Sequence, residues 1–173
     1  GDCFCLFYDA SKNRVKGLNG SGRAPGELSI DKLSELGIEE ELPSPSVHTV
    51  TVPGAAAGWV DTIDKFGSMD ISEVLEPAIN LAENGFPVSP ITAHAWANGV
   101  YKLKRGPYGD EMLIDGRAPR VGELMRNPTL ASTFREVSES GKSGFYQGRI
   151  AEAIVDLIQS MGGFMTLEDL ENH

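Results

Sequence analysis

A glycine-rich turn that carries one arginine constrains this chain more than any other feature. Residues 18–25 read LNGSGRAP and follow a strand-like apolar run that begins at Cys3. Glycines allow positive φ angles and a close approach of the backbone to a neighbour. The planar guanidinium of arginine binds a carboxylate through two parallel hydrogen bonds. Arg23 is therefore the candidate residue for binding an acidic small molecule, and a structural ion pair or a contact with a helix C-terminus is the alternative.

The first eighteen residues predict a β-hairpin. Residues 3–8 are apolar and aromatic, residues 9–13 supply turn-forming side chains, and residues 14–18 alternate basic and apolar. The first strand is apolar on both faces, so we expect it to lie in a sheet covered on both sides. Cys3 and Cys5 would point to the same face. We expect them to be small buried core residues and not part of a metal site.

The rest of the chain predicts a helix-rich α+β fold in a single domain over residues 1–173. Residues 47–52 contain several β-branched side chains and predict a short strand, after which residues 55–173 are expected to be mainly helical. A pattern typical of a capping box at residues 70–73 opens a helical run in which Pro77 predicts a kink or two abutting helices. Further helices are expected at residues 29–36, 55–66, 90–104, 129–139, 148–161 and 166–171.

Composition excludes several classes of function. A net charge of −10 and an isoelectric point near 4.7 argue against nucleic acid and against an anionic membrane surface as partners. No apolar run approaches the roughly 18 residues of a membrane span. His48, His94 and His173 are scattered without the spacing of metal ligands. No phosphate-binding loop is present, and we expect neither a metal nor a cofactor.

Short motifs in a fixed order extend over nearly all of the chain. Besides residues 18–25 they are VTVPGAAAGW at 50–59, VLEPA at 74–78, AENGFPV at 82–88, RNP at 126–128, FYQG at 145–148 and GGFMTLEDL at 162–170. Together they resemble the large-subunit part of the gamma-glutamyltranspeptidase family. The residues around Arg23 are most similar to the acylase-like branch of that family.

This resemblance implies part of the four-layer αββα sandwich of the N-terminal-nucleophile hydrolases. Such enzymes are made as a precursor that cuts itself, and the new N-terminal threonine of the small subunit is the nucleophile. That threonine typically stands in a Thr-Thr-His context, which this sequence lacks. We therefore expect a piece of a longer precursor with the small subunit as its partner. The piece should contain no catalytic residue and should be inactive alone, because a hydroxyl nucleophile needs its activating amine.

The resemblance also implies an activity. The enzyme would transfer a γ-glutamyl group from a small-molecule donor such as glutathione to water or to an amino acid, with Arg23 holding the α-carboxylate of the donor. Two alternatives stay open. The first is an acylase of the same fold that acts on another acidic acyl amide, such as a glutaryl amide. The second is a non-catalytic scaffold that keeps the fold but never processes itself.

Overall fold

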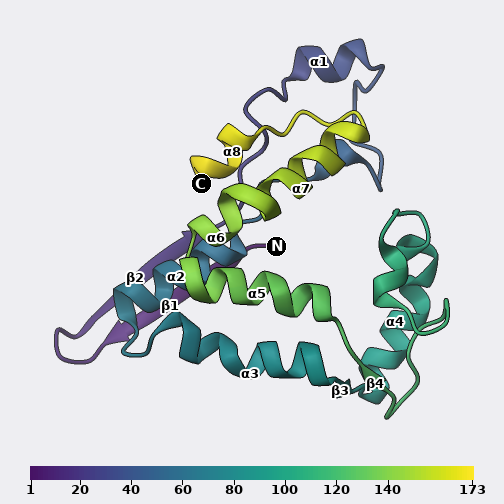
Figure 1. Ribbon diagram of the computed structural model, residues 1–173. Helices are drawn as coiled ribbons and strands as arrows, with labels where there is room; N and C mark the ends of the chain where they lie inside the picture. The colour runs from purple at the N-terminus through teal and green to yellow at the C-terminus, as the bar shows by residue number, and fades with distance from the viewer. The chain divides into compact units, whose positions relative to one another are not determined.

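The computed structural model describes residues 1–173, and these divide into two compact units (Figure 1). Unit 1 consists of residues 1–71 and 136–173, and unit 2 consists of residues 72–135. An inner stretch of the chain forms one unit, and the two ends of the chain together form the other. Unit 1 is therefore discontinuous in sequence.

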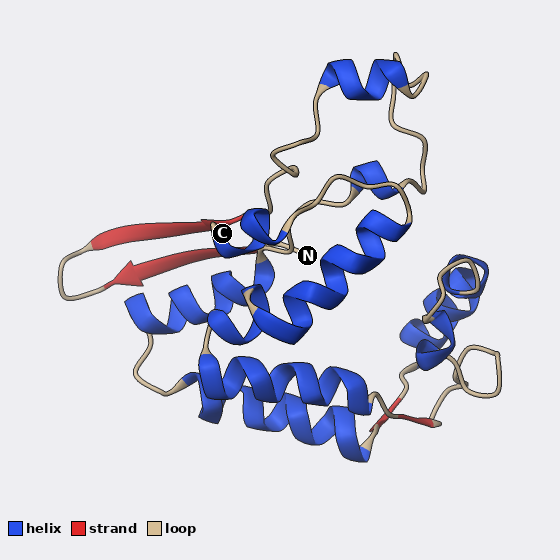
Figure 2. Cartoon of the chain, turned by 45° about the horizontal axis from the view of Figure 1, so that its top comes forward, coloured by secondary structure: helices blue, strands red, loops and turns tan.

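Unit 1 begins with an antiparallel hairpin, the long pair of red strands in Figure 2. β1 (Cys3–Asp9) pairs with β2 (Arg14–Gly20) along the full length of both strands. One face of the hairpin packs on α2 (Ala55–Phe66). The ring of Phe7 stacks on that of Phe66 with a centroid separation of 4.9 Å. This aromatic contact and the ladder fix the hairpin on the helix.

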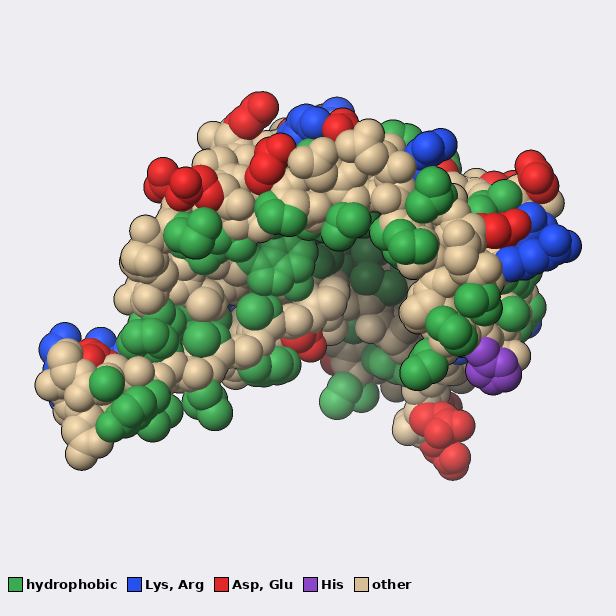
Figure 3. Space-filling view, turned by 90° about the horizontal axis from the view of Figure 1, so that it is seen from below, with side chains coloured by type: hydrophobic (Ala, Val, Ile, Leu, Met, Phe, Trp, Pro, Cys, Tyr) green, Lys and Arg blue, Asp and Glu red, His purple; other side chains and the backbone are tan.

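The opposite face of β1 is exposed, so the expectation of a strand covered on both sides is wrong for this part of the chain. Phe4, Leu6 and Tyr8 alternate along that face and are 67%, 84% and 57% exposed. Hydrophobic side chains are visible on the arm at the left of Figure 3. Cys3 and Cys5, on the inner face, are free and half-buried where full burial was expected. The described residues provide one cover for this hairpin, and that cover is α2.

The rest of unit 1 is helical, and its core joins residues from both ends of the chain. Its other helices are α1 (Ile30–Glu35), α6 (Ser143–Tyr146), α7 (Gly148–Ser160) and α8 (Leu167–Glu171). The buried core cluster consists of Val52, Ala56, Ala57, Tyr146, Ala151, Val155, Ile158, Met165 and Leu170. Burial of these apolar side chains holds the N-terminal and C-terminal segments of unit 1 together.

The short strand expected at residues 47–52 is absent, and that prediction is wrong. A 3-10 helix, η1 (Val47–Thr49), occupies this region. Ser46 caps it, since Ser46 Oγ accepts a hydrogen bond from His48 N at 3.2 Å. Thr49 Oγ1 donates back to Ser46 O at 2.7 Å. Such local bonds from hydroxyl side chains compete with an extended backbone, and here they outweigh the β-branched composition.

Unit 2 contains three α-helices and one two-stranded sheet. Its elements are α3 (Ile71–Asn84), β3 (Phe86–Pro87), α4 (Pro90–Leu103), the 3-10 helix η2 (Gly109–Met112), β4 (Leu124–Met125) and α5 (Pro128–Ser140), of which β3 and β4 pair antiparallel. The helix α3 continues through Pro77 as a single element, although proline removes one hydrogen bond of the helix, so the alternative of two abutting helices is not found. None of the chain's helices has the length and apolar character needed to cross a membrane.

A two-pronged ion pair fixes the loop that precedes β4 in unit 2. Nη1 of Arg117 donates to Oε2 of Glu123 at 2.7 Å, and Nη2 donates to Oε1 at 2.9 Å. Arg120 N also donates to Glu123 Oε2 at 2.6 Å. These bonds, from Arg117 first, lower the pKa of Glu123 to about 2. The loop therefore closes around an ionised carboxylate.

Candidate functional site

The loop that carries Arg23 leaves the end of β2 and is tied down on both sides of the arginine. Gly22 N donates to Asp2 Oδ1 at 2.9 Å. Arg23 O accepts a hydrogen bond from Val52 N at 2.9 Å. Pro25, two residues later, is buried. The backbone at Arg23 is thus fixed by segments that are distant in sequence.

Close packing explains the glycines of this region. A Cβ atom on Gly22 would lie 1.9 Å from Val52 O, and one on Gly58 would lie 2.5 Å from Cys3 Cβ. Neither distance is compatible with a side chain. The sequence allowed either a positive φ or a close backbone approach at Gly22, and the structure shows the close approach.

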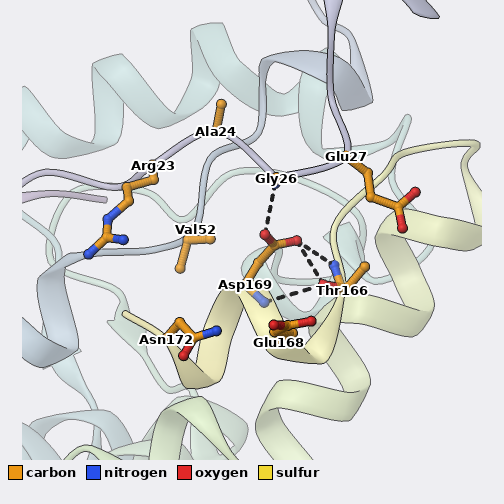
Figure 4. Close-up of a pocket in the computed structure, with 9 residues that line it drawn as sticks. All are labelled: Arg23, Ala24, Gly26, Glu27, Val52, Thr166, Glu168, Asp169 and Asn172. Carbon is orange, nitrogen blue, oxygen red and sulfur yellow. Dashed lines mark hydrogen bonds between the residues drawn. The ribbon is translucent and has the colours of Figure 1, made fainter.

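The guanidinium of Arg23 is exposed and makes no hydrogen bond or ion pair within the chain. It lines a cavity of about 470 Å³ together with residues of the loop and of α8 (Figure 4). It also lines a neighbouring cavity of about 390 Å³, whose wall includes Asp61 and His173. No carboxylate of this chain pairs with Arg23, so its five donors are available to an anion.

Asp169 joins the Arg23 loop to the start of α8. Its Oδ1 accepts from Gly26 N at 2.8 Å, and its Oδ2 accepts from Thr166 N at 2.8 Å and from Thr166 Oγ1 at 2.9 Å. Thr166 Oγ1 in turn accepts from Asp169 N at 3.3 Å, which completes a capping box. Burial acts to raise the pKa of Asp169, but these hydrogen bonds bring it below its ordinary value. The Asp169 side chain is therefore ionised, and its carboxylate connects the Arg23 loop to the start of α8.

Tyr146 supplies the missing cap of α2. Its hydroxyl donates to Pro53 O at 2.5 Å and accepts from Ala57 N at 3.0 Å. Gly54, the N-cap residue, has no side chain that could satisfy the amides of the first turn. Burial raises the pKa of the Tyr146 phenol, so the hydroxyl keeps its proton. A residue near the end of the chain thereby holds the helix that supports the Arg23 loop.

The wall of the smaller cavity carries a mixed set of charges. Lys142 Nζ lies 2.8 Å from Asp61 Oδ1. The ring of His173 lies beside Tyr146, with centroids 5.4 Å apart. Burial first, and then the positive charges of Arg23 and Lys142, lower the pKa of His173. His173 is therefore neutral near pH 7, and the positive charge on this side of the cavity comes from Arg23.

Sequence reasoning singled out Arg23 but gave no role to Asp169 or Tyr146. The TLED pattern at residues 166–169 carried a signal, because it matches a capping box. Nothing in the local sequence could show that the same carboxylate also binds Gly26. The structure contains no group of three or more His, Cys, Asp or Glu side chains that could hold a metal ion.

Comparisons with known proteins identify a family and several similar structures. The family model described as gamma-glutamyltranspeptidase matches residues 1–173. The glutathione hydrolase-like YwrD proenzyme of Bacillus subtilis is 33% identical over 175 residues, an alignment that covers 100% of this chain and 33% of that protein. The chain thus spans about a third of the length of the curated relatives it matches.

Two solved structures are similar over nearly the whole chain. The cephalosporin acylase from Bacillus halodurans gives a TM-score of 0.92 with 37% identity, covering 99% of this chain and 33% of that one. The gamma-glutamyltranspeptidase of Helicobacter pylori gives a TM-score of 0.90 with 27% identity, covering 99% of this chain and 50% of that one. The helix-rich α+β fold with small antiparallel sheets is therefore similar to structures of both kinds.

Proposed function

This chain belongs to the gamma-glutamyltranspeptidase family, and we propose that it forms the large-subunit portion of an enzyme that cleaves γ-glutamyl amide bonds. The glutamyl group passes to water or to an amino acid. Relatives with the word proenzyme in their names support a precursor that splits into subunits. The threonine nucleophile lies on a downstream segment, so residues 1–173 alone are inactive.

One observation carries this proposal: Arg23 is an unpaired guanidinium on an anchored loop. A bidentate bond to the donor's α-carboxylate would orient the γ-amide carbonyl relative to a nucleophile elsewhere. Since Arg23 already lacks an internal partner, binding an anion there breaks no existing ion pair.

The complete protein would form the αββα sandwich of N-terminal-nucleophile hydrolases. The bare outer face of β1 supports this, because Phe4, Leu6 and Tyr8 are all more than half exposed. Such an apolar face is typical of a strand that packs against a further layer. Residues 1–173 would then be one portion of the large subunit and not a self-sufficient domain.

An acylase that acts on another acidic acyl amide is the second candidate. It is favoured by the similarity to a cephalosporin acylase at a TM-score of 0.92. A glutaryl amide keeps the carboxylate that Arg23 would bind and lacks only the α-amino group. The ratio of activity on γ-glutamyl and glutaryl amides therefore decides between the two candidates.

The test replaces Arg23 with alanine in the full-length, self-processed protein. A charge-assisted hydrogen bond is worth about 1.5–3 kcal/mol, so kcat/KM for γ-glutamyl p-nitroanilide should fall roughly 10- to 150-fold. The matched donor is 4-aminobutanoyl p-nitroanilide, which keeps the amino group and lacks the carboxylate. Its kcat/KM should stay unchanged.

Two further variants sharpen this test. Arg23→Lys should recover only part of the loss, because a point charge cannot reproduce the two-bond fork. Arg14→Ala removes an exposed arginine of β2 and should leave both donors unaffected. If Arg23→Ala impairs both donors equally, Arg23 has a structural role and the proposal fails.

A further inference from the structure

We propose that Asp169 is a positioning residue for carboxylate recognition, acting through the Arg23 loop. The inference rests on the proposed function of Arg23 and adds a residue that the sequence did not single out. Asp169 forms no ion pair with the Arg23 guanidinium, which extends away from it. It fixes the backbone from which Arg23 extends.

The bonds of Asp169 show how it does this. One carboxylate oxygen binds Gly26 N of the loop at 2.8 Å, and the other binds the first turn of α8 through Thr166. Figure 4 shows the carboxylate between these two segments, with dashed lines to each. The two oxygens thus connect parts of the chain that are 143 positions apart.

The loop has few other anchors downstream of Arg23. The carbonyl of Arg23 is held by Val52 N, and Leu28 N closes a turn onto Pro25 O at 3.0 Å. That turn is internal to the loop and does not tie it to the rest of unit 1. The bond from Gly26 N to Asp169 is therefore the hydrogen bond that fixes the far end. Without it, the loop keeps the bond at Arg23 O and the buried Pro25 but loses its hydrogen bond to α8, so the backbone that follows Arg23 is held less firmly.

Charge alone predicts the opposite effect, which makes the inference testable. Asp169 and Arg23 line the same cavity, yet in Figure 4 the Arg23 side chain extends away from the Asp169 carboxylate. Removing a negative charge from this cavity would by itself favour an anionic donor. If Asp169 instead positions the loop, its loss weakens binding of that donor.

The experiment uses the full-length protein with Asp169→Ala, which removes both acceptor oxygens, and Asp156→Ala as the matched control on the exposed side of α7. We expect kcat/KM for γ-glutamyl p-nitroanilide to fall about tenfold in Asp169→Ala, mostly through KM, because a misplaced binding group loses its orientation. Activity on 4-aminobutanoyl p-nitroanilide should be unchanged. A gain on the γ-glutamyl donor, or equal losses on both donors, would overturn the inference.

Two more variants separate positioning from helix capping. Thr166→Val weakens the cap of α8 but leaves the bond between Asp169 and Gly26, so donor preference should stay as in the unmodified protein. The double variant with Arg23→Ala and Asp169→Ala should lose no more than Arg23→Ala alone, because both changes act on one contact. Additive losses, or a Thr166→Val effect equal to that of Asp169→Ala, would refute the role.

Trypsin gives a readout that does not depend on activity. It cleaves after Arg23, and a loosened loop should be cut several-fold faster in Asp169→Ala than in Asp156→Ala. If Asp169→Ala does not fold, both measurements are made on Asp169→Glu, which keeps the charge but misplaces the acceptor oxygens. Unchanged trypsin cleavage would overturn the positioning role of Asp169 but would leave the proposed function of Arg23 untouched. An Arg23→Ala variant with unchanged donor preference would instead sink the proposed function.

Discussion

Replacing Tyr146 with phenylalanine removes one hydroxyl that serves two backbone groups at the start of α2. The hydroxyl donates to Pro53 O at 2.5 Å and accepts from Ala57 N at 3.0 Å. Ala57 N belongs to the first turn, whose amides have no partner within the helix, and Gly54 offers no side chain in its place. The change therefore leaves one donor and one acceptor unpaired beside the core of unit 1.

The size of the effect follows from these two groups. An unsatisfied buried polar group costs about 1–3 kcal/mol, and loss of an N-cap costs typically about 1 kcal/mol. The ring itself stays in place, so its apolar packing is retained. We expect the free energy of unfolding to fall by about 2–4 kcal/mol in Tyr146→Phe. With a urea slope of about 2 kcal/mol/M, the midpoint should drop by about 1–2 M.

Urea unfolding of the full-length protein measures this shift, and hydrogen exchange of the Ala57 amide locates it. Tyr101→Phe makes the same chemical change at a tyrosine that is 57% exposed and should leave the midpoint unaltered. Exchange at Ala57 should accelerate in Tyr146→Phe and not in Tyr101→Phe. Equal midpoints and equal exchange in the two variants would refute the capping argument.

Three further perturbations have effects that can be predicted from the described contacts. Gly22→Ala should lower the free energy of unfolding by about 1–3 kcal/mol, because its Cβ would lie 1.9 Å from Val52 O. Gly99→Ala, in the middle of α4 with no atom within 4 Å of its Cβ, should raise it by about 0.5–1 kcal/mol; urea titration checks both signs. The pKa of Glu123 falls from 4.5 to about 2 on folding, so its pair with Arg117 stabilises above pH 4.5 and is lost as the pH drops toward 2. Unfolding measured across that window should show a loss of stability that Glu123→Gln lacks, and parallel curves would contradict it.

Local signals predicted most of the helices. The helix expected at residues 55–66 is found as α2 (Ala55–Phe66), and Ser29 caps α1 by accepting a hydrogen bond from Lys32 N. Such features depend on a few neighbouring residues, so their chemistry is legible in the sequence. The same holds for the capping box at the start of α8.

Features that depend on distant partners were not predictable. The β-branched residues at 47–52 suggested a strand, but no strand lies beside them and hydroxyl bonds to the backbone fix η1 instead. A β-propensity is realised only against a pairing neighbour. The exposure of the outer face of β1 could not be predicted for a related reason, since apolar side chains show that a face is suited to burial but not whether another element lies on it.

The same contrast between local and distant contacts holds for the residues of the candidate site. Arg23 could be singled out because glycine, arginine and proline in a short loop carry a recognisable chemistry. The roles of Asp169 and Tyr146 could not, because each acts on backbone groups far away in the chain, at Gly26 and at Pro53. The type of a residue does not reveal whether its backbone N–H or C=O group binds a distant side chain.

Because unit 1 is discontinuous in sequence, its N-terminal part is synthesised well before its C-terminal part. Gly26 leaves the ribosome 143 residues ahead of Asp169, an interval of roughly 7–30 s at about 5–20 residues per second. Residues 72–135 of unit 2 are complete in the meantime. Throughout this interval the arginine loop lacks its bond to Asp169, and α2 lacks its cap from Tyr146. These N-terminal segments therefore reach their final contacts only when the C-terminal part of unit 1 has been made.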